Sequence, residues 1–206
     1  MCLMRYVIMA NGKGRRWGES GGISKHLIVI DKESLLERMI RIIREIDPSC
    51  ELILSSSRSE YDRLNVTRYA PSSNEFEIDR FPVDLADVPV CFIYGDVYYT
   101  YDSLRCIVDA RSSDFLFFGN ENSIVAVKSF DASLFSRKLK RLKERIYCGD
   151  VDDGKGWQLY HWLLDMPMPG HAVSDHFIRI EDETRDFNTP DQLNAFLAQR
   201  SRHCDA

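Results

Sequence analysis

Residues 5–18 read RYVIMANGKGRRWG, an apolar run that passes directly into a loop rich in glycine and arginine. The run from Arg5 to Ala10 is typical of a buried strand. The loop that follows, from Asn11 to Lys25, contains five glycines, and glycines let a backbone turn tightly and bring its N–H groups close to an anion. Ligands of α/β proteins bind at the carboxyl ends of the strands. The stretch therefore predicts an α/β fold with a phosphate-binding loop after its first strand.

Strand and helix patterns alternate through the rest of the chain. Apolar residues in segment 33–46 recur with the 3.6-residue period of an amphipathic helix, which Pro48 closes. Apolar runs predict strands at 51–55, 90–94, 114–118, 123–127 and 176–180, and further helices are predicted at 101–110, 131–146, 154–164 and 190–199. This alternation predicts a single α/β domain over residues 1–206, with a mainly parallel, twisted sheet and helices on both of its faces.

Segment 56–89 lacks a periodic pattern of this kind. It is polar and is interrupted by three prolines, Pro71, Pro82 and Pro89. We predict only one short helix in this segment, near Tyr61, and assign it no role.

The composition excludes several classes of protein. A hydrophobic fraction of 44% and a charged fraction of 29% are ordinary for a globular chain. The net charge of -5 argues against a dedicated nucleic-acid partner. Apolar runs fall short of the roughly 18 residues that span a bilayer, so no membrane partner is expected. The N-terminal run enters the glycine loop without a cleavage site, which favours a strand over a signal peptide.

The cysteines indicate a reducing compartment. They are widely and irregularly spaced and form no C-x-x-C pair: Cys2, Cys50, Cys91, Cys106, Cys148 and Cys204. This spacing argues against a zinc site and against a disulfide framework. We therefore expect buried or incidental thiols in a cytoplasmic protein.

The glycine loop matches neither of two common phosphate loops. The Walker pattern is absent, and Gly12, Gly14 and Gly18 give G-x-G-x-x-x-G instead of the dinucleotide pattern. The segments ANGKGRRW at 10–17 and SKHLI at 24–28 instead resemble the signature of the nucleotidyltransferases that activate sugar phosphates and similar phosphomonoesters, including molybdenum-cofactor guanylyltransferases. In that family the first strand runs into Ala-Ala-Gly-x-Gly-(Ser/Thr)-Arg-(Met/Leu), and a Pro-Lys pair follows. Departures occur at Asn11, Arg15, Trp17 and Ser24.

The resemblance implies a fold and a set of site residues. The fold is the Rossmann-like fold of nucleotide-diphospho-sugar transferases. Arg16 and Lys25 are implied as the catalytic cations. The nucleotide-binding loop is implied to consist of Ala10, Asn11, Gly12, Lys13, Gly14 and Arg15. The similarity covers roughly residues 4–46, 90–104 and 176–199, and the glycine-rich segment with which many members read the nucleobase is not found in 56–89.

Two further motifs suggest a magnesium site. Asp96 follows the apolar strand 90–94 and Gly95, at the edge of the sheet where the glycine loop also lies, and this is similar to the family's strand-Gly-Asp metal motif. Magnesium prefers oxygen ligands and usually takes one or two protein carboxylates. We therefore predict that Asp96 binds Mg²⁺, although an aspartate after a strand can also be a simple turn or helix cap.

The second motif lies at 185–193, where the sequence reads RDFNTPDQL. It resembles the family's late motif, which carries the second metal ligand and then begins the last helix. Asp186 and Asn188 are two residues apart and share one side of an extended segment, so either or both are predicted as metal ligands. Thr189 and Pro190 are the ordinary beginning of a helix.

Together these motifs predict a Mg²⁺-dependent enzyme. It transfers a nucleoside monophosphate from a nucleoside triphosphate to a phosphomonoester, such as a sugar 1-phosphate or phosphocholine, and releases pyrophosphate. Two alternatives stay open: a non-catalytic nucleotide-binding or regulatory module of the same fold, and a nucleotide-sugar-dependent glycosyltransferase. The latter would need a D-x-D motif where the chain has Gly95-Asp96-Val97-Tyr98. A homodimer is also left open.

Overall fold

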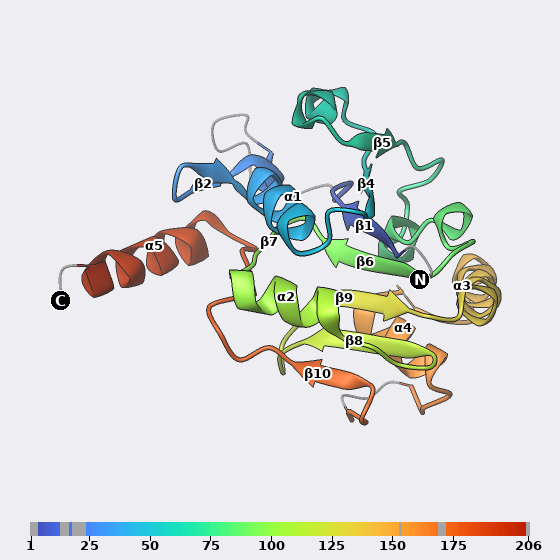
Figure 1. Ribbon diagram of the computed structural model, residues 1–206. Coiled ribbons are helices and arrows are strands. Elements are labelled where there is room, and N and C mark those ends of the chain that lie inside the picture. The colour runs from blue at the N-terminus through green and yellow to red at the C-terminus, as the bar shows by residue number, and fades with distance from the viewer. Residues whose placement is uncertain (1–3, 13–16, 18–23, 153, 169–171, 205–206) are drawn as a thin grey trace.

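A seven-stranded sheet with the order β10-β8-β9-β6-β1-β4-β5 lies at the centre of the computed structural model (Figure 1). The structure describes residues 4–12, 17, 24–152, 154–168 and 172–204, and residues 202–204 are described by their backbone alone. The strands of the sheet are β1 (Arg5–Met9), β4 (Glu51–Ser55), β5 (Thr67–Tyr69), β6 (Val90–Tyr94), β8 (Phe115–Gly119), β9 (Ile124–Ser129) and β10 (Phe177–Arg179).

The sheet is mainly parallel, as predicted. β1 runs parallel to β4 and β6, β4 to β5, and β8 to β10. Only β9 runs antiparallel to its neighbours, β6 and β8. β6, β8 and β9 are buried along their whole length, which is why these segments are largely apolar, with Lys128 and Ser129 at the end of β9 as exceptions.

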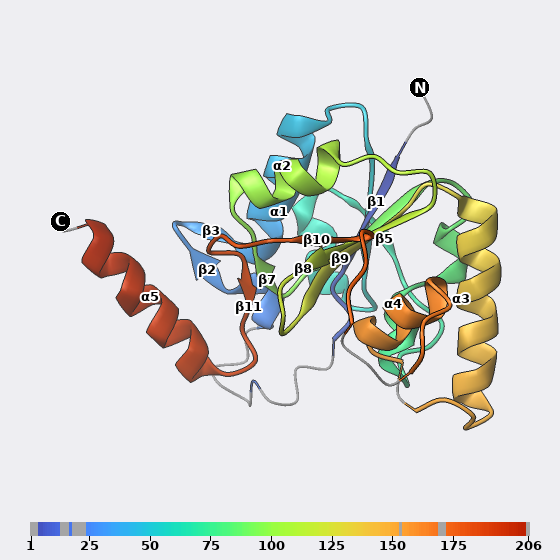
Figure 2. The ribbon, with the colours of Figure 1, turned by 90° about the horizontal axis from the view of Figure 1, so that it is seen from below.

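Helices cover both faces of the sheet, which confirms the predicted α/β class. The helices are α1 (Leu35–Ile46), α2 (Tyr101–Asp109), α3 (Ala132–Tyr147), α4 (Gly156–Leu163) and α5 (Pro190–Cys204). Figure 2 shows α1 and α2 on one face and α3 and α4 on the other. None of the helices in the described ranges is long and apolar enough to cross a membrane.

α1 begins two residues later than its apolar pattern predicts. Ser34 is the N-cap: its hydroxyl accepts a hydrogen bond from the backbone N–H of Glu37, while the Glu37 carboxylate accepts one from the N–H of Ser34. This capping box satisfies two of the N–H groups that a helix leaves free at its start. Glu33 and Ser34 instead form β3, which pairs with β2 (Val29–Ile30) in a short hairpin.

Segment 56–89 contains more structure than its sequence indicated. The short helix predicted near Tyr61 is the 3-10 helix η2 (Ser59–Leu64), but β5 and two further 3-10 turns, η3 (Glu77–Arg80) and η4 (Val83–Leu85), were not predicted. Turns of this length are too short to show a period.

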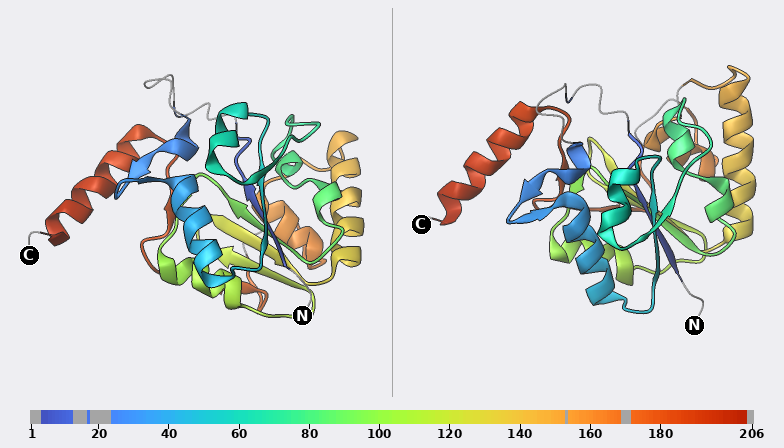
Figure 3. Two further views of the ribbon diagram at one scale, coloured as in Figure 1. Left: turned by 45° about the horizontal axis from the view of Figure 1, so that its top comes forward. Right: turned by 90° about the horizontal axis from the view of Figure 1, so that it is seen from above.

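α5 extends beyond the predicted residue 199 to Cys204. It packs on a second apolar cluster, separate from the main core, that contains Trp17, Ile28, Ile30, Leu35, Tyr98, Phe187 and Phe196. Figure 3 shows α5 beside the β2–β3 hairpin, at the opposite side of the molecule from α3. The cluster therefore joins the glycine-loop region to the C-terminal helix.

A buried lysine closes the carboxyl end of α2. Lys128, in the middle of the sheet, is fully buried. Its ammonium donates hydrogen bonds to the carbonyls of Ile107 (2.8 Å), Val108 (2.7 Å) and Ala110 (3.0 Å). These carbonyls have no partner within the helix, and a cation at this end also favours the helix dipole.

Lys128→Met should therefore destabilise the protein. The variant keeps the apolar stem but leaves the carbonyl of Ile107 without its donor, while the carbonyls of Val108 and Ala110 keep the Arg111 guanidinium (2.7 and 2.9 Å). We therefore expect a loss of about 2 kcal/mol in the free energy of unfolding. Urea denaturation measures the change. The matched control, Lys140→Met on the exposed side of α3, should change stability by less than about 0.5 kcal/mol. A Lys128→Met protein as stable as the wild type would contradict this role.

Candidate active site

The carboxyl ends of β1, β4 and β6 meet at one edge of the sheet. The ladder continues one residue past β1, because Ala10 donates its N–H to the carbonyl of Ser55 (2.9 Å). On the other side, Gly95 donates its N–H to the carbonyl of Met9 (3.0 Å). The first residues of the glycine loop and Asp96 therefore leave the sheet side by side.

Gly95 is required for this close approach. A Cβ atom on Gly95 would lie 2.9 Å from the carbonyl oxygen of Met9 and 3.2 Å from Cγ2 of Ile8. Real Cβ atoms do not approach backbone oxygens so closely, so a larger residue would push the turn away from β1. The glycine before Asp96 thus sets how near the carboxylate comes to the glycine loop.

Asn11 connects the end of β1 to two neighbouring segments. Its side-chain oxygen accepts hydrogen bonds from the N–H (3.0 Å) and the hydroxyl (2.8 Å) of Ser57. The side-chain amide of Asn74 donates to the Asn11 carbonyl (2.7 Å). The departure from the alanine of the signature therefore has a structural use, since it fixes the first turn of the loop.

Lys25 and Asp96 form an ion pair at the centre of this edge. Their side chains are only 13% and 15% exposed. Burial alone would raise the pKa of Asp96, but the charges of Lys25 and His26 and a hydrogen bond from Lys25 hold this pKa below its usual value. Asp96 is therefore ionised at neutral pH and ready to accept a cation.

Arg80 joins the site although no sequence signal indicated it. A Cβ atom on Gly12 would lie 3.7 Å from Nη2 of Arg80 and 3.8 Å from Cε of Lys25. The backbone of Gly12 is thus flanked by two cations, one from η1 (Lys25–Leu27) and one from η3.

Four of the predicted site residues, Lys13, Gly14, Arg15 and Arg16, lie outside the described residues. Trp17, which follows them, is buried in the second apolar cluster against α5. Trp17 replaces the aliphatic residue of the signature, so this departure serves packing.

The late motif lies close to Asp96. Arg185 and Asp186 form β11, which pairs antiparallel with β7 (Val97–Tyr98), and Asp186 stands directly opposite Val97. Residues paired in this way have Cα atoms roughly 4.5–5.5 Å apart. The two motifs, 90 positions apart in the sequence, are therefore neighbours in space.

The donor atoms of these motifs suit magnesium. Asp96 and Asp186 offer carboxylate oxygens, and Asn188 offers an amide oxygen because its NH₂ group donates to Asp186 Oδ2 (2.7 Å). Oxygen-only donor sets are what Mg²⁺ prefers. Among the described residues, no group of three or more His, Cys, Asp or Glu side chains could hold a metal. A metal site in this part of the chain would therefore need other ligands as well, such as the amide oxygen of Asn188.

α5 holds the late motif in place. Gln192 accepts hydrogen bonds from the N–H groups of Asn188 (2.6 Å) and Thr189 (3.3 Å), as expected at a helix start. Further along α5, Arg200 donates to the hydroxyl of Tyr98 and to the carboxylate of Asp31 (2.8 Å). The last helix is therefore tied to β7, the strand that follows Asp96.

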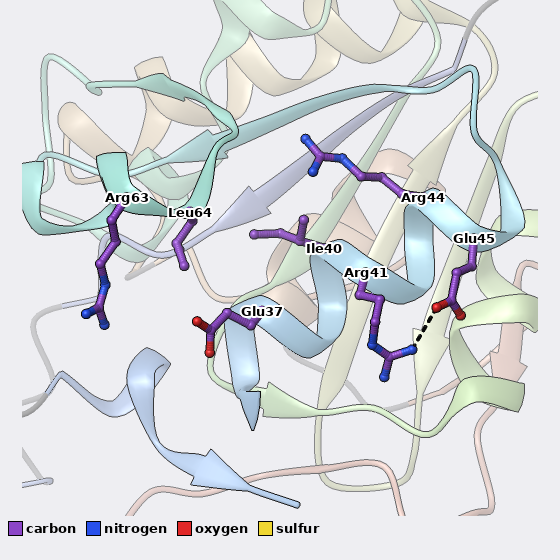
Figure 4. A pocket seen from close by; sticks show the side chains of 7 residues that line it. All are labelled: Glu37, Ile40, Arg41, Arg44, Glu45, Arg63 and Leu64. Carbon is purple, nitrogen blue, oxygen red and sulfur yellow. Dashed lines mark hydrogen bonds and ion pairs between the residues drawn. The ribbon is translucent and has the colours of Figure 1, made fainter. Parts of the chain in front are cut away.

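A groove of about 480 Å³ lies elsewhere, between α1 and η2 (Figure 4). It is lined by Glu37, Ile40, Arg41, Arg44, Glu45, Arg63 and Leu64. Arg41 and Glu45 neutralise each other across 3.0 Å. None of the predicted site residues lines this groove, so it is separate from the candidate active site.

Comparisons with known proteins support the fold. No protein-family model and no curated protein matches the chain. Solved structures match over nearly its whole length. A protein from Bacillus anthracis described as a glucose-1-phosphate thymidylyltransferase has a TM-score of 0.66 at 12% identity, covering 95% of this chain and 94% of that one.

Two further enzymes match as well. The 4-diphosphocytidyl-2C-methyl-D-erythritol synthase of Anaerococcus prevotii has a TM-score of 0.66 at 13% identity and covers 97% of this chain and 99% of its own. The CTP:phosphocholine cytidylyltransferase of Streptococcus pneumoniae has a TM-score of 0.61 at 11% identity, with coverages of 94% and 97%. The chain has the fold of these nucleotidyltransferases. At such identities the likeness extends to the fold alone, which confirms the predicted fold class.

The residue after Lys25 in η1 is a buried histidine, His26. His26 is 1% exposed, and its Nδ1 lies 3.0 Å from the hydroxyls of both Ser24 and Tyr61. The hydroxyls of Ser24 and Tyr61 are also hydrogen-bonded to each other (2.5 Å). Burial lowers the pKa of His26 from 6.5 to about 4, so the ring is neutral at pH 7.

Stability should therefore fall in acid in a way that depends on His26. Between pH 6.5 and about 4 the unfolded chain binds a proton that the folded chain does not, so the free energy of unfolding decreases as the pH falls. From about pH 7.5 to about 4.5 we expect this group to contribute a loss of about 2.5 kcal/mol. Denaturant unfolding at both pH values checks this. His26→Gln should lose about that much less than the wild type, and equal losses would contradict a buried neutral His26.

Proposed function

We propose that the protein is a Mg²⁺-dependent nucleotidyltransferase. It transfers a nucleoside monophosphate from a nucleoside triphosphate to a phosphomonoester and releases pyrophosphate. The observation that carries this proposal is the Lys25–Asp96 ion pair beside the backbone of Gly12, next to the strand that bears Asp186. Cations, a glycine backbone and oxygen ligands for a metal are the groups that a reaction between two polyanions needs.

This reaction requires the protein to position the two substrates and to neutralise their charge. An oxygen of the acceptor phosphate attacks the α-phosphorus, and the bond from that phosphorus to the bridging oxygen breaks as pyrophosphate leaves. The acceptor phosphate has a second pKa near about 6 and is ionised at neutral pH, so no general base is required. Gly12 and the predicted loop residues hold the triphosphate, and Arg16 and Lys25 neutralise charge on the α-phosphoryl group and on the leaving pyrophosphate.

Asp96, Asp186 and Asn188 are the residues that would hold the magnesium ion. When bound, the ion neutralises phosphate charge and orients the reacting groups. Asp96 accepts the Lys25 ammonium in the protein alone. The stem of Lys25 lies beside Gly12, so its ammonium is within reach of phosphates that the glycine loop would hold.

The names of the structural neighbours support the same reaction class. They are a thymidylyltransferase, a cytidylyltransferase and a diphosphocytidyl synthase, with glucose 1-phosphate and phosphocholine among the named acceptors. These names suggest sugar 1-phosphates and phosphocholine as the acceptors to test first. The base and the acceptor of this chain are to be found by experiment.

A pyrophosphate-release screen tests the proposal. The full chain is incubated with each of four nucleoside triphosphates, with Mg²⁺, and with a panel of sugar 1-phosphates, phosphocholine and related phosphomonoesters. We expect release with one triphosphate and one acceptor class, and none when Mg²⁺ is removed with a chelator. Nucleotide binding without release under any combination would favour the non-catalytic module, and transfer of a sugar from a nucleotide sugar would favour the glycosyltransferase.

Lys25→Ala should lower turnover about 100- to 1,000-fold, because the loss of one charge-stabilising donor costs roughly 2.7–4 kcal/mol in the barrier. The same size of effect is expected for Arg16→Ala. Steady-state pyrophosphate release measures it. Near-normal turnover in either variant would contradict the assignment of the glycine loop.

A double variant separates catalysis from simple stabilisation by the ion pair. Lys25→Ala leaves the Asp96 carboxylate without its partner, so part of its effect could be lost stability. Lys25→Ala combined with Asp96→Asn removes both charges, and we expect it to recover thermal stability but not turnover. Recovery of turnover in the double variant would show that the pair is structural.

Asp96→Asn and Asp186→Asn should each lower the apparent affinity for Mg²⁺ in turnover. Each variant keeps the size of the side chain but removes one negative charge from the metal ligands, so the half-saturating Mg²⁺ concentration should rise about tenfold or more. Mg²⁺ and Mn²⁺ titrations of pyrophosphate release measure this. Asp102→Asn, at an exposed position of α2, is the control. An unchanged Mg²⁺ requirement in both variants would remove these residues from the metal site.

A further inference from the structure

The position and the hydrogen bonding of Arg80 are those of an anion-binding residue. Its guanidinium Nη2 faces the backbone of Gly12, beside the stem of Lys25. Its Nε is buried and finds no hydrogen-bond acceptor among the described residues. A buried donor without an acceptor is costly and rare in folded proteins, so a missing partner at this position needs an explanation.

The nearest carboxylate does not satisfy this arginine. Oε1 of Glu77 lies 4.0 Å from Nη1 of Arg80, which is beyond hydrogen-bond distance. Glu77 instead accepts a hydrogen bond from the hydroxyl of Tyr94. Arg80 is therefore balanced electrostatically by Glu77, but its Nε donor is left over.

The turn that carries Arg80 is held firmly from two sides. The neighbouring Asp79 is buried, and its carboxylate accepts hydrogen bonds from four donors: the hydroxyls of Ser73 and Tyr147 and the N–H groups of Glu75 and Phe76. On the other side, a Cβ atom on Gly154 would lie 2.9 Å from Cβ of Ile78. The missing side chain at Gly154 lets its backbone pack directly on η3.

Arg80 lies close to the Lys25–Asp96 pair. Nη2 of Arg80 and Cε of Lys25 lie 3.7 and 3.8 Å from the position that a Cβ atom on Gly12 would occupy, and Lys25 is paired with Asp96. The two cations can therefore share one anionic ligand beside Gly12.

We infer that Arg80 binds the phosphate chain of the nucleotide, as a third cation that lies beside Lys25 at Gly12. The inference rests on the proposed function and adds to it a residue from segment 56–89, which the motifs do not cover. An arginine suits this position because its fork of donors can bind two phosphate oxygens at once. Nη2 and the unpaired Nε of Arg80 supply such a fork, and the hydrogen bonds to Asp79 fix the η3 turn that carries it.

Inorganic pyrophosphate with Mg²⁺ is the probe, because it carries the phosphate groups without a base or an acceptor. Its affinity for the full chain is measured by titration calorimetry. We expect Arg80→Ala to bind it at least about tenfold more weakly and Arg80→Lys, which keeps the charge but not the fork, about threefold more weakly. Arg141→Ala, which removes the same charge from an exposed position of α3, should bind it like the wild type.

Glu77→Gln distinguishes ligand binding from support of the fold. The side-chain amide of this variant could still accept the hydrogen bond from Tyr94, but no carboxylate would then compete with the phosphates for Arg80. Pyrophosphate affinity should therefore rise about two- to fivefold. A purely structural role for the Arg80–Glu77 contact predicts a loss of affinity in both Arg80→Ala and Glu77→Gln.

Each outcome separates the two proposals. If the wild type binds Mg²⁺-pyrophosphate and folded Arg80→Ala binds it within twofold, the inference about Arg80 is wrong and the proposed function stands. If Arg80→Ala fails to fold, Arg80→Lys decides, and wild-type affinity in that variant together with weaker binding in Glu77→Gln contradicts the inference. If the wild type binds neither pyrophosphate nor any nucleoside triphosphate, the proposed function itself is wrong, and the role of Arg80 falls with it.

Discussion

The ion pair between Lys25 and Asp96 connects parts of the chain that are 71 positions apart, and the geometry of the site depends on it. Both side chains are mostly buried, so each charge needs the other while the site holds no ligand. The pair can form only because Gly95 lets the end of β6 press against β1. The ion pair, and with it the charge distribution of the site, therefore depends on the parallel pairing of β1 with β6.

Segments that are far apart in the sequence meet at the same edge of the sheet. Asn11 ties β1 to Ser57 and Asn74, and the β7–β11 pairing brings Asp186 to the residue after Asp96. Such contacts use side chains and short ladders in place of the regular hydrogen bonds of a helix. They fix the loops that carry the candidate ligands, which is what a site built on charge and positioning requires.

The fold could be predicted from the sequence because its signals are local. Apolar runs mark β1, β4 and β6, and the 3.6-residue period marks α1. The later start of α1 was also legible, since Ser34 and Glu37 have the spacing of a capping box. The position of Arg80 at the site could not be predicted from the sequence, because it depends on the four hydrogen bonds to the neighbouring Asp79. Lys128 directly follows an apolar run, and only the structure reveals its contact with α2.

The departures from the family signature take on a different meaning once their contacts are known. In sequence, the departures at Asn11, Arg15 and Ser24 keep open a module that has lost its chemistry, and Trp17 is a further departure from the signature. In the structure Asn11 secures the first turn of the loop, and Trp17 anchors its middle on the cluster that α5 and Phe187 complete. Substitutions that merely followed a loss of function would not be expected to gain such specific partners. The buried charges of Lys25 and Asp96 favour the same conclusion, because apolar residues in place of a buried ion pair often give equal or greater stability.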